Sequence, residues 1–342
     1  MVGYTLFLIP IAIAIFLAFN MGGSGTSPAY SASYGANLIR RELIPGLFGA
    51  FVLLGALIAG SKVVKTIGGD ILPSESMSLV IVSIILLASA LSIFIANILK
   101  VPQSTSQSTI FSLAGCALYL GNLQTGKLFF EIIPTWLITP LISFVITYLV
   151  GGMLIKWQQK KKLADYKVLS EKPVWKYITI GCSCYVAFAI GSNNVANSAG
   201  PITSMLINTA DFQLADTEAV FALISILLVA PWFGIGSSFL GKRVLDTTGE
   251  GITRLGPISA TLIAVITATL LLMASTLRGI PTSLVQMNTF SIIALSIVEN
   301  GPKDVLSKQV LLKVFTVWLV APVVAFIISY SLMIAAESLN LI

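Results

Sequence analysis

The chain has 342 residues, of which 56% are hydrophobic and only 10% charged, and its net charge is +6. A soluble chain carries about a quarter charged residues, so this composition excludes an ordinary soluble domain and predicts an all-α polytopic membrane protein. The chain contains no histidine, which excludes a Ser-His-Asp triad and a histidine proton relay. No P-loop or dinucleotide-binding glycine pattern is present, and we therefore expect neither an enzyme nor a cofactor.

Ten apolar runs follow one another along the chain. A membrane-spanning helix needs roughly 20 residues. The runs at 108–121 and 284–298 are short, and the run at 128–155 is long enough to tilt or bend. The ten runs occupy residues 4–20, 43–60, 77–99, 108–121, 128–155, 174–191, 217–240, 257–277, 284–298 and 311–336.

All three cysteines, Cys116, Cys182 and Cys184, lie in apolar runs. This placement argues against a disulfide framework. The Cys182-x-Cys184 spacing has no third ligand nearby, so we expect no metal site.

The polar stretch from Lys156 to Lys176 carries seven lysines. Juxtamembrane lysines indicate a cytoplasmic loop much more often than a nucleic-acid site. This loop separates a first unit, 1–155, from a second unit, 174–342, through a basic linker at 156–173. With five apolar segments in each unit, the second copy is inserted upside down, which is the inverted-repeat plan of many transporters, with broken or re-entrant helices. Both chain termini are then expected outside the cell.

Two motifs recur at matching places in the two units. Residues 102–107 and 281–286 share the pattern Pro-x-Ser-x-x-Gln, and the Trp-Leu-x-x-Pro sequence at 136–140 returns at 318–322. A third pair, residues 20–27 and 190–201, is rich in glycine, hydroxyls and amides. We expect the helices to break at these pairs, because irregular backbone within a membrane persists only where it is buried or lines a wet cavity. Close helix packing by small residues is the alternative for the glycines.

These motifs offer a site for a small tetrahedral oxyanion. Proline favours the first turn of a helix, and a helix N-terminus presents unpaired N–H groups and a partial positive charge. An inverted repeat would bring two such N-termini together from opposite sides. Ordinary N-capping by serine or threonine is the alternative reading, but its recurrence at matching positions favours a site. The expected substrate-binding residues are Gly23, Ser24, Gly25, Thr26, Ser104, Thr105, Ser106, Gln107, Asn193, Asn194, Thr282, Ser283 and Gln286.

The chain resembles the inorganic phosphate transporters, a family (PiT) that includes sulfate permeases. Residues 191–201, Gly-Ser-Asn-Asn-Val-Ala-Asn-Ser-Ala-Gly-Pro, match the family's Gly-Ala-Asn-Asp-Val-Ala-Asn signature, and residues 22–28 are a degenerate first copy. Residues 102–107 and 281–286 match its repeated Pro-x-Ser-Thr-Thr-His. The resemblance covers nearly the whole chain. It implies an inverted-repeat transporter, usually a homodimer, that moves an oxyanion together with a cation.

Departures from the family pattern point to sulfate. The signature aspartate is Gly25 in the first copy and Asn194 in the second, and both family histidines are glutamines. In the family's phosphate members the acidic residues help to bind sodium. Sulfate carries no proton at neutral pH, so a site made mainly of donors favours it. We therefore expect sulfate import at the cell membrane, coupled to protons rather than sodium.

Few residues could couple or gate the transport. Glu131, Asp246 and Asp70 are the candidate proton carriers, and Asn197 is a candidate for coupling. Lys65 and Asp246 hold equivalent places in two Val-x-x-Thr motifs and could pair as a gate, or else be two interfacial charges that face water. A sodium-coupled phosphate symporter is the nearest rival function; an intramembrane enzyme acting on a lipid phosphate and a channel are more distant ones.

Overall fold

The computed structural model describes residues 2–98, 103–161, 173–210, 217–245, 257–306 and 309–342. Within these ranges the chain is helical and contains no strand. The elements are α1 Val2–Gly35, η1 Arg41–Leu43, α2 Ile44–Ala59, α3 Ser61–Gly69, η2 Ser74–Ser76, α4 Leu79–Ile98, α5 Thr105–Tyr119, α6 Thr125–Lys127, η3 Leu128–Ile132, α7 Ile133–Lys161, α9 Pro173–Asn194, α10 Ala196–Thr209, α11 Thr217–Val229, α12 Pro231–Leu245, α13 Pro257–Met273, η4 Ala274–Arg278, α14 Leu284–Asn300, α15 Pro302–Leu306 and α16 Gln309–Ser338.

Eight stretches of the described chain are helical, long and apolar enough to cross a membrane. They account for eight of the ten predicted runs. The other two runs form α5 and α14, helices of 15 and 17 residues, which are too short to be counted among the spans. The prediction of an all-α, multi-pass membrane protein is confirmed.

The expected break in the first glycine-rich motif is absent. Residues 20–27 lie within α1, which is continuous from Val2 to Gly35. In the second copy α9 ends at Asn194 and α10 starts at Ala196; Val195 between them keeps α-helical dihedral angles (φ −60°, ψ −33°), so only the hydrogen-bond pattern is interrupted there. The glycines of the first copy serve packing instead of a bend: a Cβ at Gly22 would overlap the backbone of Phe233 in α12.

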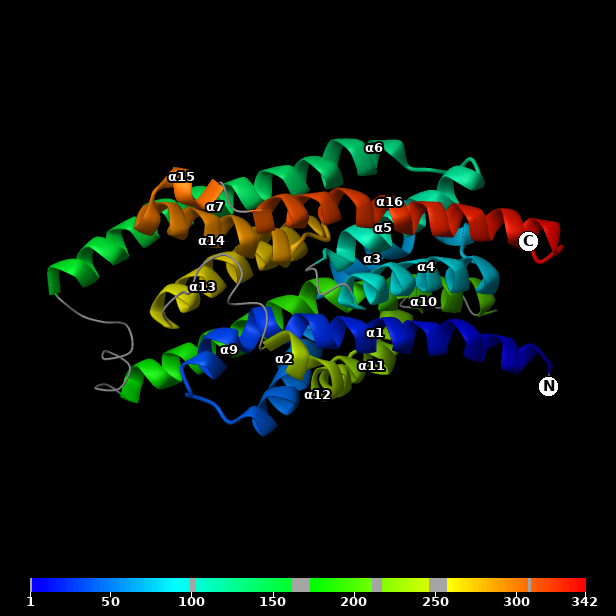
Figure 1. Cartoon of the computed structure of the whole chain (residues 1–342). Helices are drawn as coiled ribbons and strands as arrows, with labels where there is room; N and C mark the ends of the chain where they lie inside the picture. Colours follow the sequence, from blue (N-terminus) through cyan, green and yellow to red (C-terminus); the bar gives the residue numbers. More distant parts are fainter. Residues whose placement is uncertain (1, 99–102, 162–172, 211–216, 246–256, 307–308) are drawn as a thin grey trace.

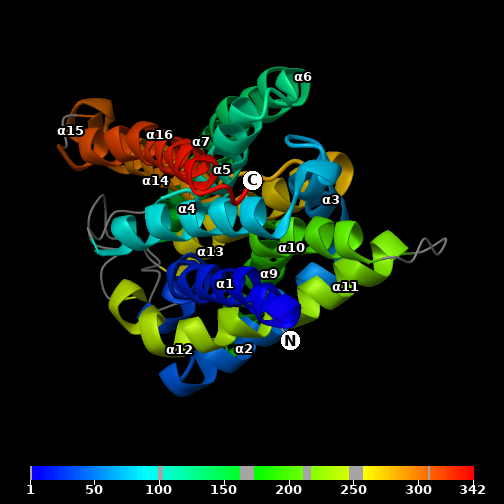
Figure 2. The same cartoon turned by 90° about the vertical axis from the view of Figure 1, so that its right-hand side faces the viewer.

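The helices form two groups with α4 and α13 between them (Figures 1 and 2). In one group α1 packs on α12 and α9 packs on α2; in the other α5 packs on α16 and α14 packs on α7. Helix α4 contacts α1, α5 and α16, whereas α13 contacts α9, α14 and α7. In each of these four pairs a helix from the first half of the chain packs on a helix from the second half. A two-fold relation between the halves would require this pattern. The inverted relation and its boundaries at 155 and 174 stay predictions.

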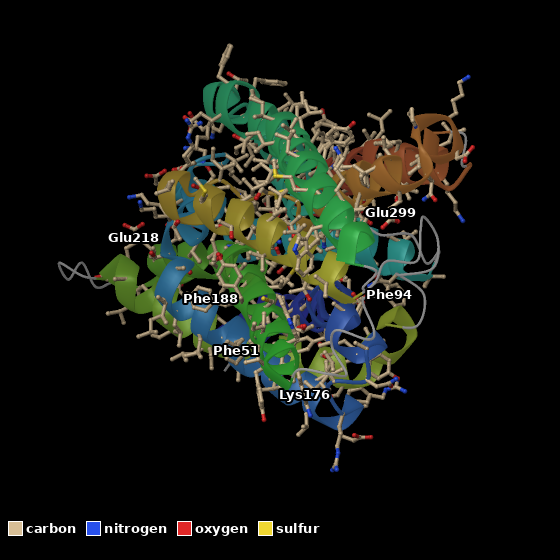
Figure 3. All side chains as sticks on the ribbon, turned by 90° about the vertical axis from the view of Figure 1, so that its left-hand side faces the viewer. Phe51, Phe94, Lys176, Phe188, Glu218 and Glu299 are labelled. Carbon is tan, nitrogen blue, oxygen red and sulfur yellow. The ribbon has the colours of Figure 1, made fainter. Side chains whose placement is uncertain are left out.

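Close backbone approach holds the first group together. A Cβ at Gly55 would overlap the carbonyl oxygen of Phe188, and a Cβ at Gly191 would overlap that of Val52. Both contacts join α2 to α9, the neighbouring helices that carry Phe51 and Phe188 in Figure 3. Small residues allow helices in lipid to approach closely enough for dispersion contacts to hold them.

The two chain ends lie at one end of the bundle, and the end of α7 and the start of α9 lie at the opposite end (Figure 1). Helix α7 continues through Lys161, so the first part of the predicted basic linker extends a helix. Residues 162–172 of the linker lie outside the described residues. Which end of the bundle faces the cytoplasm stays a prediction.

Candidate functional site

Two helices begin at the repeated Pro-x-Ser-x-x-Gln motif, and the same type of cap starts both. Ser104 is extended, and its Oγ accepts the N–H of Gln107 at 3.3 Å. Ser283 is likewise extended, and its Oγ accepts the N–H of Gln286 at 3.2 Å. A serine N-cap satisfies one of the four N–H groups that a helix start leaves without intrahelical partners. The remaining groups of each first turn are available to a ligand.

Both helix starts open on one pocket. The pocket is small: its cavity volume of about 30 Å³ is room for about two water molecules. It lies between α1 and α9 on one side and the starts of α5 and α14 on the other. No lining residue is acidic or basic. The lining consists of Ser24, Gly25, Pro28, Gln103, Ser104, Thr105, Ile190, Asn194, Thr282, Ser283, Leu284 and Val285.

Polar side chains of the lining supply hydrogen-bond donors in addition to the N–H groups of the helix N-termini. Thr282 is 1% exposed, and its Oγ1 has no partner among the described residues. The Oδ1 of Asn194 accepts a hydrogen bond from Asn193 at 2.7 Å, so the amide NH₂ of Asn194 remains to donate. A pocket with two helix N-termini, hydroxyls and an amide donor suits an anion.

Asn193 lies behind the pocket and holds its second wall. Its Oδ1 accepts the N–H of Thr282 at 2.9 Å and the hydroxyl of Ser275 at 3.3 Å. Its Nδ2 has two hydrogens for three acceptors within reach: Asn194 Oδ1 at 2.7 Å, the Thr282 carbonyl at 3.0 Å and Ser106 Oγ at 3.1 Å. The side chain is fully buried. These bonds fix the residues before α14 to α9 and to the first turn of α5, so Asn193 positions the pocket instead of lining it.

Gln103 lines the pocket but is not among the substrate-binding residues expected from the sequence. Its Nε2 donates to the hydroxyls of Ser92 and Ser108. Those two hydroxyls donate in turn to the carbonyls of Ala321 and Ser104, which fixes the orientation of the amide. The Oε1 of Gln103 has no partner among the described residues and is the acceptor of a mostly donating pocket. Its place in the Pro-x-Ser-x-x-Gln motif could have identified it, because Thr282, an expected binding residue, holds the same place in the second copy.

Three other predicted residues lie behind the pocket or away from it. Gln107 and Gln286 bond to each other, at 3.1 Å in both directions. Asn197 is fully buried and donates to Thr105 Oγ1 at 3.4 Å, and its Oδ1 has no partner among the described residues.

The first glycine-rich motif divides between two neighbours. Ser24 and Gly25 line the pocket. Thr26 Oγ1 instead donates to the Gly22 carbonyl and lies 2.7 Å from the hydroxyl of Ser237 in α12, from which it can accept. A Cβ at Gly23 would overlap Leu240 of α12. Gly23 and Thr26 therefore belong to the α1–α12 contact.

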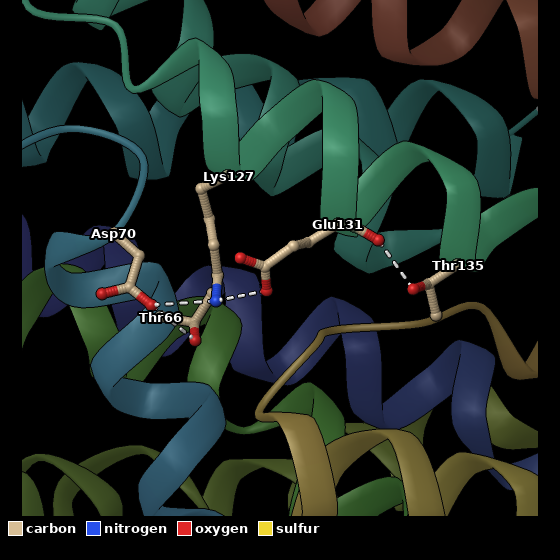
Figure 4. Close-up of polar contacts among 5 residues, drawn as sticks. All are labelled: Thr66, Asp70, Lys127, Glu131 and Thr135. Carbon is tan, nitrogen blue, oxygen red and sulfur yellow. Dashed lines mark hydrogen bonds and ion pairs between the residues drawn. The ribbon is translucent and has the colours of Figure 1, made fainter.

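The predicted coupling charges are not in the pocket. Lys65 lies 3.9 Å from Glu218, and both side chains are mostly exposed; Asp246 lies outside the described residues. Glu131 and Asp70 share one cation, Lys127, at 2.8 and 3.6 Å (Figure 4).

Comparison with known proteins assigns the family. The model of the Phosphate transporter family matches residues 21–329, and the chain belongs to that family of anion transporters. It is 32% identical over 326 residues to the sulfate permease CysP of Bacillus subtilis, covering 95% of this chain and 86% of the relative. It is 26% identical to the putative phosphate permease MJ0630 of Methanocaldococcus jannaschii, covering 94% of each.

The fold also has a solved counterpart. A structure described as the sodium-dependent phosphate transporter matches with a TM-score of 0.80 and 22% identity, covering 97% of this chain and 99% of that one. At this identity the match establishes the shared fold alone.

Proposed function

We propose that the protein imports sulfate across the cell membrane by alternating access, driven by a proton gradient, and that it works as a homodimer. The observation that carries the anion site is the pair of capped helix N-termini, Ser104 and Ser283, facing one pocket without a charged lining residue. A helix N-terminus binds an anion through its N–H groups and dipole, without the desolvation cost of burying a counter-charge. Membership of an anion-transporter family supports transport over catalysis on a lipid phosphate.

The donor content of the pocket supports sulfate as the substrate. Sulfate has no proton to donate near neutral pH, whereas monohydrogen phosphate needs an acceptor for its proton. No carboxylate lines the pocket, and the amide of Asn194 presents its donor side. The similarity to a sulfate permease points in the same direction.

We assign proton coupling to carboxylates outside the pocket. Among the described residues, the candidate carriers Glu131 and Asp70 share Lys127. Glu131 is half-exposed, so its carboxylate can exchange protons with water. In this proposal the transport cycle changes the separation of Asp70, at the C-terminal end of α3, from Glu131 on η3.

A specific observation favours the rival, a sodium-coupled phosphate symporter. The unpartnered Oε1 of Gln103 could accept the proton of monohydrogen phosphate, and the unpartnered Oδ1 of Asn197 could ligate sodium. Amide oxygens are suitable ligands for a hard cation. The solved protein of the same fold is described as sodium-dependent.

Radiolabelled sulfate uptake into proteoliposomes separates the two functions. We expect uptake that follows an imposed proton gradient, does not follow a sodium gradient and is insensitive to excess unlabelled phosphate. Sodium-driven uptake that phosphate blocks would replace the sulfate proposal with the phosphate symporter. The orientation proposed here, with both termini outside and the 156–176 loop in the cytoplasm, is tested in cells by labelling single cysteines placed at either end.

A further inference from the structure

Gln107 and Gln286 form a closed pair of side-chain amides between α5 and α14. Each Nε2 donates to the other residue's Oε1 at 3.1 Å. The two side chains are 7% and 8% exposed. Each amide contributes one donor and one acceptor, so the pair forms only when the two groups lie antiparallel at a set distance.

The pair joins two helices that otherwise pack elsewhere. Helix α5 packs mainly on α16 and α4, and α14 packs mainly on α7 and α13. Their N-terminal turns nevertheless face the same pocket. A rigid link at the third residue of each helix therefore fixes the separation of the two starts.

The pair also changes the way in which each helix is capped. The sequences Ser104-x-x-Gln107 and Ser283-x-x-Gln286 fit the capping box, in which the glutamine side chain reaches back to the N-cap backbone N–H. Here each glutamine side chain is committed to the other helix. No hydrogen bond within the described part of the chain takes up the backbone N–H of Ser104 or Ser283. Both serines line the pocket, so these two groups remain for the ligand.

We propose that the Gln107–Gln286 pair is a positioning clamp. It sets the distance between the two anion-binding helix starts and so selects among tetrahedral oxyanions by size. The glutamines act through the two first turns and do not line the pocket. This inference rests on the anion site proposed above, and it holds for whichever oxyanion the protein carries.

Replacing one amide by a carboxyl group tests the clamp through pH. A protonated Glu has one donor and one acceptor, like the amide, whereas an ionised Glu has acceptors only. For Gln107→Glu and Gln286→Glu we expect uptake, relative to wild type at the same pH, to fall about tenfold from pH 5 to pH 8, because burial raises a carboxyl pKa into this range. Gln124→Glu is the matched control, since Gln124 is exposed and does not line the pocket. Its uptake should follow wild type at every pH.

A double-mutant cycle tests selectivity. Gln107→Leu and Gln286→Leu each remove the pair, and the readout is the ratio of KM for molybdate to KM for sulfate. We expect either variant to reduce this ratio about tenfold and the double variant to reduce it no further, because coupled residues are not additive. Elution in detergent shows whether each variant is folded, and if a leucine variant is not, the glutamate variants decide.

Glu variants that follow wild type across the pH range, or additive effects on the KM ratio, would overturn the clamp. If wild type carries phosphate and not sulfate, the proposed function fails. The clamp is then tested by the same pH series with phosphate, and by a KM ratio of arsenate to phosphate.

Discussion

Two of the repeated pairs, the helix-start motifs and the glycine-rich motifs, have diverged to different extents. The starts of α5 and α14 remain equivalent: each has an extended serine cap, a cap bond of 3.2–3.3 Å and a glutamine that pairs with its counterpart. The motifs in α1 and at the α9–α10 junction do not. One is a continuous helix. The other has a one-residue gap in its helical hydrogen-bond pattern at Val195 and carries a buried amide, Asn193, with bonds to α5, to η4 and to the segment before α14.

This difference indicates which parts of a duplicated unit stay similar in the two copies. The helix starts face each other and one shared pocket, so a change in one start alters the geometry of both. The glycine-rich motifs contact different neighbours, α12 for the first copy and the Thr282 segment for the second. They are free to specialise, and Asn193 has acquired bonds for which its counterpart, Ser24, has no equivalent.

The largest expected effect comes from glycine positions that are alike in both copies. Gly191→Ala and Gly22→Ala would each press a Cβ into a backbone carbonyl of a facing helix. Overpacking costs about 1–3 kcal/mol, and backbone yields less than a side chain, so we expect the upper end and a strong loss of folded protein in detergent. Gly181→Ala in α9 is the control, because a Cβ there meets nothing within 4 Å. A normal yield of both variants would show that the facing helices separate easily.

The second prediction measures the asymmetry directly. Asn193→Ala would leave the Thr282 N–H and the Ser275 hydroxyl without their present acceptor, and each buried unsatisfied group costs about 1–3 kcal/mol. Ser24→Ala removes one bond, to the Met21 carbonyl of its own turn. We expect sulfate uptake to be nearly abolished in the first variant and reduced only a few-fold in the second. Equal losses would mean that the two motifs are functionally equivalent after all.

The third prediction tests the equivalence of the helix starts. Ser104→Ala and Ser283→Ala each remove a cap worth about 1 kcal/mol, together with a pocket hydroxyl. We expect KM for sulfate to rise about five- to tenfold in both, with normal membrane insertion. Ser338→Ala, an exposed position at the end of α16, is the control. An unchanged KM in both variants would remove the helix-start site.

The smallest effect is expected at Lys65. Its contact with Glu218 is long, and both side chains are mostly exposed. Exposed ion pairs contribute about 0–1 kcal/mol to stability. Lys65→Met should therefore leave the uptake rate and its pH dependence within about twofold of wild type. A large loss would revive the proposed gate between Lys65 and Asp246.

Much of the fold was readable from sequence, because lipid imposes simple rules. Composition and the spacing of apolar runs predicted the spans, and the two runs that fell short of a span became α5 and α14. The continuity of α1 was not readable. Glycines and hydroxyls at 20–27 are compatible with a bend and with close packing, and the choice depends on whether another helix, here α12, lies against them.

The candidate site divides in the same way. The amino-acid sequence by itself determined the repeated serine caps, because capping depends on residues three apart in one chain segment. It also determined the absence of histidine and the scarcity of charge in the apolar runs. Only the tertiary structure decided which polar residues face the pocket and which support it. Gln103 turns to the pocket, whereas Asn193, Gln107 and Gln286 bond behind it. The physical reason is that a buried amide bonds to whichever partners the packed helices bring within reach. The partners of Asn193 in the α5 and Thr282 segments, and those of Gln107 and Gln286, lie more than eighty residues away along the chain.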